Sequence, residues 1–175
     1  MPSQNQDPNV PLVLWLNGGP GYSSLFGLLA GIGPVTEDNF GGKYEINPYS
    51  WNTKVNLLAI EQPAGFGFSK ASEPEFNWTG DLMAEYLMVG IKDLINEFNL
   101  KGKDFYVSDE SYAGVYIPYL VKYILNDRSE KNINLKGVLM GKELTKPDVD
   151  FERIMVEFGF WHGMISSKTF NLFKK

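Results

Sequence analysis

The segment 104–114 reads Asp104-Phe105-Tyr106-Val107-Ser108-Asp109-Glu110-Ser111-Tyr112-Ala113-Gly114. Its first five residues predict a strand, and the apolar residues that continue as far as Leu125 predict a helix. Ser111 therefore lies in a turn between a strand and a helix. This arrangement is typical of a nucleophile elbow, in which the serine hydroxyl projects above a sheet and the amide of the next residue, Tyr112, faces a developing oxyanion. Serine is also a common N-cap of helices, so the turn alone leaves that interpretation open.

Two other predicted strands end in loops that contain glycine. The continuous apolar run 11–16 predicts a strand buried on both faces, and it ends at Asn17-Gly18-Gly19-Pro20-Gly21. Residues 55–60 predict a second such strand, which ends at Glu61-Gln62-Pro63-Ala64-Gly65. The pair Gly18-Gly19 can supply a second oxyanion amide, because glycine lets a backbone N–H approach a substrate closely.

The remaining segments complete an alternation of strands and helices. Apolar residues recur at three- and four-residue steps over 81–98, which predicts an amphipathic helix that begins at Gly80-Asp81. Residues 135–140 predict a fourth strand, and 151–158 and 166–173 predict helices beyond it. The pattern indicates an α/β fold with a mostly parallel sheet and flanking helices, in a single domain over residues 1–175. Chemistry collects at the carboxyl ends of such strands, so the three loops form the candidate site.

Composition excludes several classes of protein. The chain has 175 residues, of which 43% are apolar, and this suffices for one globular core. The 16 basic and 21 acidic residues give a net charge of −5, so we expect no nucleic-acid partner. There is no cysteine and only one histidine, His162, so we expect no metal site and no cofactor. No apolar run is long enough to span a membrane, and residues 1–8 lack the pattern of a secretory signal.

The three loops form a set with a fixed order and spacing. The set comprises Asn17-Gly18-Gly19-Pro20-Gly21 with Ser23-Ser24-Leu25, then Glu61-Gln62-Pro63-Ala64-Gly65-Phe66-Gly67-Phe68-Ser69, then Glu110-Ser111-Tyr112-Ala113-Gly114 with Tyr116 and Pro118. Further matching positions are Trp51-Asn52, Asp81, Ala84, Gly137 and His162-Gly163-Met164-Ile165-Ser166. From about Asp7 to its end, the chain resembles the N-terminal catalytic portion of the serine carboxypeptidase family of α/β hydrolases. The resemblance implies an α/β-hydrolase-like fold that is truncated relative to the family.

The resemblance also implies roles for residues of the elbow. Ser111 is expected to be the nucleophile that forms an acyl-enzyme, and the amides of Gly19 and Tyr112 are expected to form the oxyanion hole. The reaction implied is the release of C-terminal residues from peptides. No cofactor takes part in that chemistry.

A second group of residues is implied to hold the substrate. The free carboxylate at the C-terminus of the peptide is expected to bind to Asn17, to the amide of Gly18 and to Glu110. Glu61 is expected to be hydrogen-bonded to Glu110. Two close carboxyl groups resist ionising together, so such a pair shares a proton and favours acidic pH.

Acyl transfer also requires a general base and an acid that orients it. The α/β hydrolases place these residues after the nucleophile, in the order Ser, Asp, His. His162 follows Ser111, but its motif matches a family histidine that is not the base, so we interpret it as a packed or capped residue near a helix start. The expected catalytic Asp and His are therefore absent from this chain.

Three further positions depart from the family pattern. Asp109 stands two residues before the serine, where the family has glycine, and we expect its side chain to strain the turn and to bring a charge near Ser111. Tyr22 stands where the family has a cysteine. Lys142-Glu143 stands where the family has Asn-Gly.

Three hypotheses account for these observations. One hypothesis is the nucleophile-bearing part of a serine carboxypeptidase, completed by further sequence or by a second chain. The alternative is a catalytically inactive binding or structural subunit, a pseudoenzyme. A third hypothesis keeps the fold but passes the acyl group to an alcohol, as in plant acyltransferases that resemble this scaffold. If the chain is complete, we expect no turnover of peptides, because Ser111 lacks a positioned base.

Two further features of the sequence bear on the protein's partner and on its cellular compartment. A truncated sheet leaves an apolar edge strand uncovered, so we expect a protein partner or a missing C-terminal portion to cover it. The sequon Asn77-Trp78-Thr79 is a possible glycosylation site, which matters only in a secretory compartment. The family is typically secreted, lysosomal or vacuolar, whereas this chain shows neither a signal peptide nor cysteine, so the localisation stays open.

Overall fold

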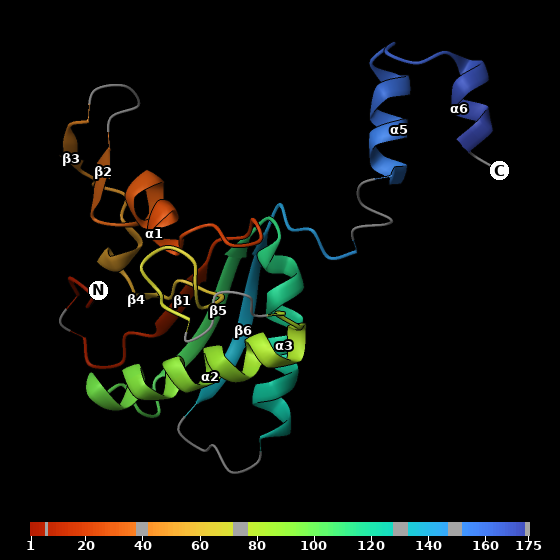
Figure 1. Ribbon diagram of the computed structural model, residues 1–175. Helices are drawn as coiled ribbons and strands as arrows, with labels where there is room; N and C mark the ends of the chain where they lie inside the picture. Colours follow the sequence, from red (N-terminus) through yellow and green to blue (C-terminus); the bar gives the residue numbers. More distant parts are fainter. Residues whose placement is uncertain (6, 38–41, 72–76, 128–132, 147–151, 174–175) are drawn as a thin grey trace. The chain divides into compact units, whose positions relative to one another are not determined.

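Four strands form a sheet in the computed structural model of this chain, in the order β4-β1-β5-β6 (Figure 1). They are β1 (Leu12–Leu16), β4 (Asn56–Ala59), β5 (Asp104–Glu110) and β6 (Asn134–Gly141). Each neighbouring pair is parallel, which confirms the predicted mostly parallel sheet. The structure describes residues 1–5, 7–37, 42–71, 77–127, 133–146 and 152–173.

The chain divides into two compact units, Met1–Glu143 and Leu144–Lys175, and each is described by itself. The sheet belongs to the first unit. A single domain over residues 1–175 stays a prediction.

The register of the sheet brings the loops of the candidate site to one edge. Leu16 at the end of β1 lies opposite Asp109 of β5, and Glu110 lies opposite Gly141 at the end of β6. Because all four strands run the same way, the loop after β1 and the turn after β5 begin side by side.

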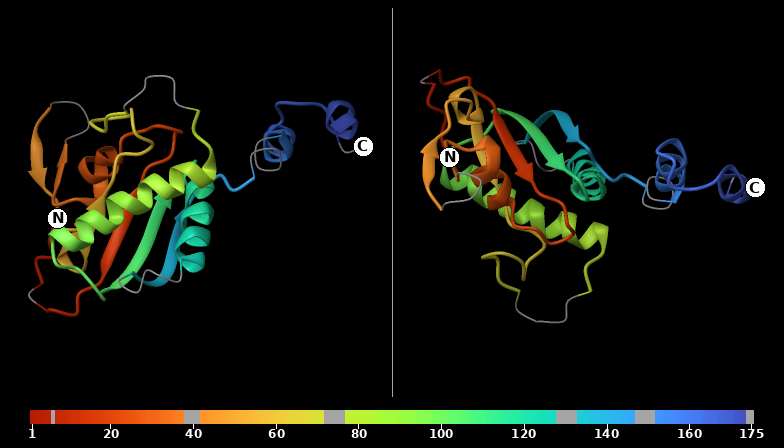
Figure 2. Two further views of the ribbon diagram at one scale, coloured as in Figure 1. Left: turned by 60° about the horizontal axis from the view of Figure 1, so that its bottom comes forward. Right: turned by 90° about the horizontal axis from the view of Figure 1, so that it is seen from above.

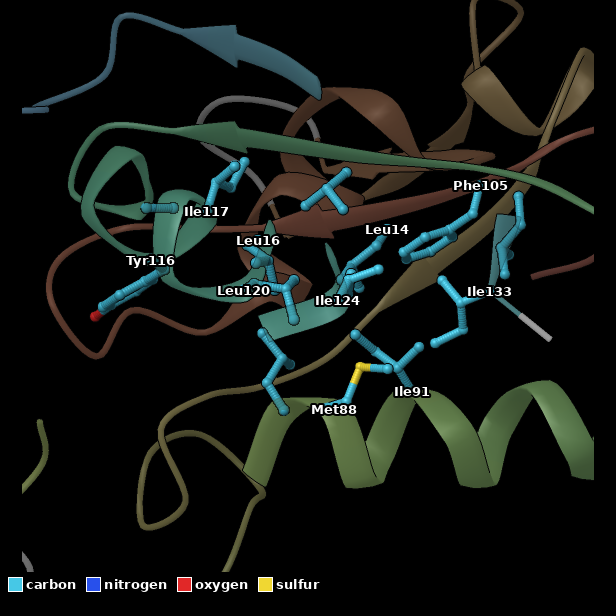
Figure 3. Packing of buried hydrophobic residues seen from close by; sticks show 14 of the residues in the cluster. Leu14, Leu16, Met88, Ile91, Phe105, Tyr116, Ile117, Leu120, Ile124 and Ile133 are labelled. Atoms are coloured by element: carbon cyan, nitrogen blue, oxygen red, sulfur yellow. The ribbon is translucent and has the colours of Figure 1, made fainter. Parts of the chain in front are cut away.

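Two long helices pack on one face of the sheet (Figures 1 and 2). They are α2 (Gly80–Glu97) and α3 (Ala113–Asn126). Figure 3 shows how their apolar side chains meet those of the strands, with Met88 and Ile91 of α2 beneath Leu14 of β1 and Phe105 of β5. Burial of these side chains supplies the main stabilisation of the unit.

Helix α2 illustrates how closely hydrophobic periodicity predicts a helix. The predicted range 81–98 differs from the observed Gly80–Glu97 by one residue at each end, and Thr79 caps the helix by accepting from the amide of Leu82 at 3.3 Å. The predicted apolar positions Met83, Leu87, Ile91 and Ile95 are buried. Phe98 lies just beyond the helix and is 60% exposed, so its assignment to the buried face is wrong.

The opposite face carries a smaller apolar cluster. Val13 and Trp15 of β1 pack there with Leu28 and with Leu57 of β4. Strand β1 is therefore buried on both faces, as predicted, because its alternate side chains enter two different clusters.

Several short elements of the first unit were not predicted. They are α1 (Ser24–Gly27), a π-helical turn at Leu28–Ile32, the antiparallel pair β2 (Val35–Glu37) and β3 (Tyr44–Ile46), and a 3-10 turn at Trp51–Thr53. Elements of three to five residues are too short to show periodicity, which explains why pattern alone misses them.

Both edges of the sheet differ from its centre. In β4 only Leu57 is fully buried, so the prediction of a second strand buried on both faces is wrong, because this strand lies at the edge. Strand β6 forms the other edge, and its Val138 and Leu139 are 43% and 48% exposed.

The described residues of the second unit include two helices, α5 (Glu152–Trp161) and α6 (Ser167–Phe173). They agree with the predicted helices at 151–158 and 166–173, except that residue 151 lies outside the described residues. Phe160 stacks on the buried Phe170 with ring centroids 4.1 Å apart. None of the helices in the described ranges is both long and apolar enough to cross a bilayer.

Candidate active site

Ser111 occupies a sharp turn between β5 and α3. Its φ of +64° places the residue in the left-handed region, which a serine adopts only where the surroundings hold it there. The turn closes as the amide of Gly114 donates to the carbonyl of Ser111 at 3.1 Å. A left-handed backbone is expected of a nucleophile elbow, whereas an ordinary N-cap residue has an extended one.

Gly18 packs directly against the elbow. A Cβ added to this residue would lie 2.3 Å from the amide nitrogen of Tyr112, 2.8 Å from the carbonyl of Glu110 and 3.0 Å from the Cβ of Ser111. No side chain fits in that space. The loop after β1 and the turn after β5 are therefore in backbone contact, with the amides of Gly19 and Tyr112 both in the contacting segments.

Glycines also shape the rest of the site. Gly19 has φ of +115°, which an L side chain rarely adopts. A Cβ on Gly21 would lie 2.4 Å from the ring of Phe66, so the loop 61–69 covers the loop after β1. The structure thus brings the three predicted loops together.

Asn17 is held in one orientation beneath the elbow. The residue is 2% exposed, and its Oδ1 accepts from Nε1 of Trp15 at 2.7 Å and from the amide of Gly27 at 3.0 Å. Because both of these partners are donors, Oδ1 faces them and Nδ2 faces the other way. Nδ2 donates to Oε2 of Glu110 at 3.3 Å.

Glu61 is held by the loop that follows it and by Ser23. Its carboxylate accepts from Oγ of Ser23 and from the amide of Phe68, and its backbone carbonyl accepts from Oγ of Ser69 at 2.6 Å. Among the hydrogen bonds of the described residues, none joins Glu61 to Glu110. The direct bond between these two carboxyl groups stays a prediction.

A pair of adjacent serines links the two acids indirectly. Ser23 donates to Glu61, and Oγ of the buried Ser24 accepts from the amide of Asn17 at 3.2 Å. Asn17 in turn donates to Glu110. The supporting residues Trp15, Ser24 and Gly27 were not predicted, since a lone tryptophan, serine or glycine carries no pattern of its own.

Asp109 is a buried carboxyl beside the elbow. It is 2% exposed, and its Oδ1 accepts from the amide of Gly141 at 3.2 Å. Within the described part of the chain, Oδ2 is buried without a hydrogen-bond partner. Burial raises the pKa of Asp109 to about 6; the hydrogen bond from Gly141 opposes this shift, and the negative charges of Glu143 and Glu110 add to it.

The expectation that Asp109 strains the turn is wrong. Its backbone pairs regularly with Leu16 on one side and Met140 on the other, and the left-handed conformation falls on Ser111 instead. A second left-handed residue, Lys142, follows β6 with φ of +53°. Asp109 and Lys142-Glu143, which both depart from the family pattern, are therefore neighbours in the structure.

Tyr112 is fixed by a neighbouring ring. It makes an edge contact with Tyr116 of α3, with ring centroids 5.4 Å apart. Burial raises the pKa of Tyr116 to about 12, so this ring stays neutral at any physiological pH.

His162 lies in the second unit, just after α5. Its Nδ1 is 2.9 Å from the carbonyl oxygen of Phe158, and its ring stacks on that of Phe158 at 3.8 Å. The residue is exposed and lies at the end of a helix, so the prediction of a packed histidine near a helix start is wrong; its contacts to Phe158 are local.

Two other predictions concern glycosylation at Asn77 and metal binding. Asn77 is exposed immediately before α2, where the sequon residue Thr79 acts as the N-cap. Across the residues that the structure describes, no three or more histidine, aspartate or glutamate side chains come together in a way that could hold a metal ion.

Comparison with known proteins places this chain in a family. The model of the serine carboxypeptidase family matches residues 1–175. Serine carboxypeptidase ctsa-4.1 of Caenorhabditis elegans is 40% identical over 92% of this chain, and the lysosomal protective protein of Mus musculus is 39% identical over 95% of it. This chain covers 34% of the length of each, so it spans about a third of the curated relatives it matches.

A solved structure agrees in fold. The prohormone-processing carboxypeptidase Kex1(delta)p of Saccharomyces cerevisiae superposes with a TM-score of 0.82 at 29% identity, over 94% of this chain and 37% of that one. The chain belongs to the serine carboxypeptidase family, with the α/β-hydrolase fold that the sequence predicts.

Proposed function

We propose that this chain carries the nucleophile and the oxyanion hole of a serine carboxypeptidase. The proposal depends on the left-handed backbone of Ser111 and on its contact with Gly18. At Gly18 there is no room for a side chain between the loop after β1 and the amide of Tyr112. Such a rigid turn is what a serine nucleophile requires, because the hydroxyl and the oxyanion donors must be fixed before the reaction begins.

In the proposed reaction, Oγ of Ser111 bonds to the carbonyl carbon of the last peptide bond. The amides of Gly19 and Tyr112 stabilise the oxyanion that develops. The hydroxyl proton passes to a general base and then to the leaving amine as the C–N bond breaks, and water hydrolyses the acyl-enzyme.

The general base is proposed to come from outside the first unit. Residues 1–143 contain no histidine, and the one histidine of the chain, His162, belongs to the other unit. The base and its orienting acid would then be supplied by further sequence or by a second chain. Residues 1–175 on their own are accordingly expected to give no turnover.

The proposed substrate is a peptide with a free C-terminus. Nδ2 of Asn17 faces the edge of the sheet where Glu110 lies, and it is supported from behind by Trp15 and Gly27. Glu110, which accepts from Asn17, and Glu61, whose loop contacts the loop after β1 through Phe66 and Gly21, are proposed to bind the carboxylate with Asn17.

The exposed edge of the sheet supports a further part of the proposal. Val138 and Leu139 of β6 are partly exposed, and among the described strands none pairs with the outer side of β6. Such an edge is covered in stable proteins, so a partner or a further segment is proposed to lie along it.

Peptide turnover tests the function. Protein purified from its source is incubated with a blocked dipeptide that has either a free or an amidated C-terminus. We expect cleavage of the free form, cleavage of the amide slower by roughly tenfold or more, and none with Ser111→Ala. Ser167→Ala, which changes an exposed serine, is the matched control.

Three results would redirect the proposal. Cleavage that persists in Ser111→Ala would contradict the role of that residue. Binding of the free peptide without turnover would favour the non-catalytic subunit. Transfer of the acyl group to an added alcohol in preference to water would favour the acyltransferase.

A further inference from the structure

The side chain of Asp109 is connected to the backbone of Ser111 through one residue. Oδ1 of Asp109 accepts from the amide of Gly141 at 3.2 Å, and the carbonyl of Gly141 accepts from the amide of Ser111 at 3.4 Å. Gly141 is thus held on both sides at the end of β6. One of its contacts is with the elbow, and the other is with a buried carboxyl.

The surroundings of this carboxyl suit its neutral form. Oδ2 is buried and unpartnered among the described residues, which costs free energy when the group is ionised. A proton on Oδ2 removes the charge and leaves Oδ1 free to accept from Gly141. The neutral acid therefore keeps the contact to β6 without a buried unpaired charge.

Neighbouring charges act in the same direction. Glu110 on the same strand and Glu143 just after β6 are the charged side chains that act on Asp109, and both are negative. On β1 the register partner is Leu16, which is uncharged, and it is followed by Asn17. On α3 the buried titratable group in the first turn is Tyr116, which stays neutral.

We propose that Asp109 is a positioning residue for Ser111, and that a change in its protonation alters the hydrogen bond to Gly141 and, through Gly141, the backbone of the elbow. The inference rests on the proposed role of Ser111 as nucleophile for its functional meaning. The coupling itself is a property of the fold. It adds to the reaction a dependence on acidity that does not involve the binding of substrate.

Nuclear magnetic resonance of the amides of Gly141 and Ser111 tests the coupling without any activity. Spectra of the chain are recorded between pH 4 and pH 8 for the wild type, for Asp109→Asn and for Glu143→Gln. Asparagine keeps an oxygen that accepts from Gly141 but cannot ionise. Glutamine at position 143 removes one negative charge that acts on Asp109.

The expected result is a common titration of both amide signals. In the wild type, the amide signals of Gly141 and Ser111 shift together with a midpoint at about pH 6. In Asp109→Asn this transition is lost. In Glu143→Gln it is kept, with a lower midpoint. A transition that survives in Asp109→Asn, or that moves Gly141 but not Ser111, would overturn the inference. If Asp109→Asn does not fold, the wild type and Glu143→Gln still decide the matter by whether both amides titrate together and move together.

A separate reaction distinguishes this inference from the proposed function. Labelling of Ser111 by a fluorophosphonate probe is measured on protein purified from its source, over the same pH range. Coupled amide titration with no labelling at any pH would overturn the role of Ser111 and leave the coupling standing. Labelling without coupled titration would overturn the inference alone.

Discussion

Asn17 and Glu110 lie 93 residues apart in the chain, yet Nδ2 of the first donates to Oε2 of the second at 3.3 Å. The contact joins the loop after β1 to the last residue of β5, immediately before Ser111. It exists because β1 and β5 are parallel neighbours that end at the same edge. The candidate site is therefore a product of sheet register as much as of the individual motifs.

Gly18→Ala is expected to distort the elbow. The added Cβ would lie 2.3 Å from the amide nitrogen of Tyr112, so backbone must move, at a cost of about 1–3 kcal/mol in the free energy of unfolding. Urea unfolding measures this cost. Gly31→Ala is the matched control, because nothing lies within 4 Å of its added Cβ. Equal stability of the two variants would contradict the close contact.

Trp15→Phe is expected to loosen Asn17. The change removes the donor at 2.7 Å from Oδ1 while keeping an aromatic ring in the cluster, and the lost hydrogen bond costs about 1 kcal/mol. Binding of a peptide with a free C-terminus should weaken as well, since Nδ2 is no longer held toward Glu110. Trp51→Phe, at a ring that makes an edge contact with Trp15, is the control. Unchanged peptide affinity in Trp15→Phe would count against the role of Asn17.

The stability of the first unit is expected to depend on the protonation of Asp109. Its pKa is about 6 in the folded chain against an ordinary 3.8, so the native state binds more protons between these values and the free energy of unfolding falls as pH rises through them. The fall amounts to at most about 3 kcal/mol and levels off above pH 6.

Asp109→Asn should remove this component of the pH dependence. Denaturant unfolding at pH 4, 5, 6 and 7 compares the variant with the wild type. The free energy of unfolding of the wild type minus that of the variant should be constant above pH 6. It should increase, in favour of the wild type, as the pH falls to 4. A difference that is the same at every pH would show that Asp109 does not titrate in this range.

Ile91→Ala is expected to destabilise the main core. Ile91 is 0% exposed on α2 and packs beneath the sheet, so its truncation should cost about 2–5 kcal/mol. Val89→Ala lies on the same helix but changes a side chain that is 57% exposed, and it should cost far less. Thermal unfolding measures both. Similar losses would contradict the orientation of α2.

Most of the fold was predictable because its signals are local. The apolar run of β1, the helical period of α2 and the alternation of strands and helices each depend on adjacent residues. The edge position of β4 was missed because strand order is decided by contacts between distant segments, which a single sequence does not display.

The candidate site was predictable as residues but not as geometry. Ser111, Gly18 and Asn17 were identified by motif, whereas the support from Trp15 and Gly27 is visible only in three dimensions. Asp109 was expected to disturb the turn. The alternation of β5 places it on the same face as the buried Phe105 and Val107, and this signal in the sequence would have predicted its burial.

Mapping of a fluorophosphonate adduct shows directly whether Ser111 is the nucleophile. Protein purified from its source is labelled, digested and analysed by mass spectrometry. We expect one adduct, on the peptide that contains Ser111, and none in Ser111→Ala. An adduct on another serine, with Ser111 unmodified, would contradict this role.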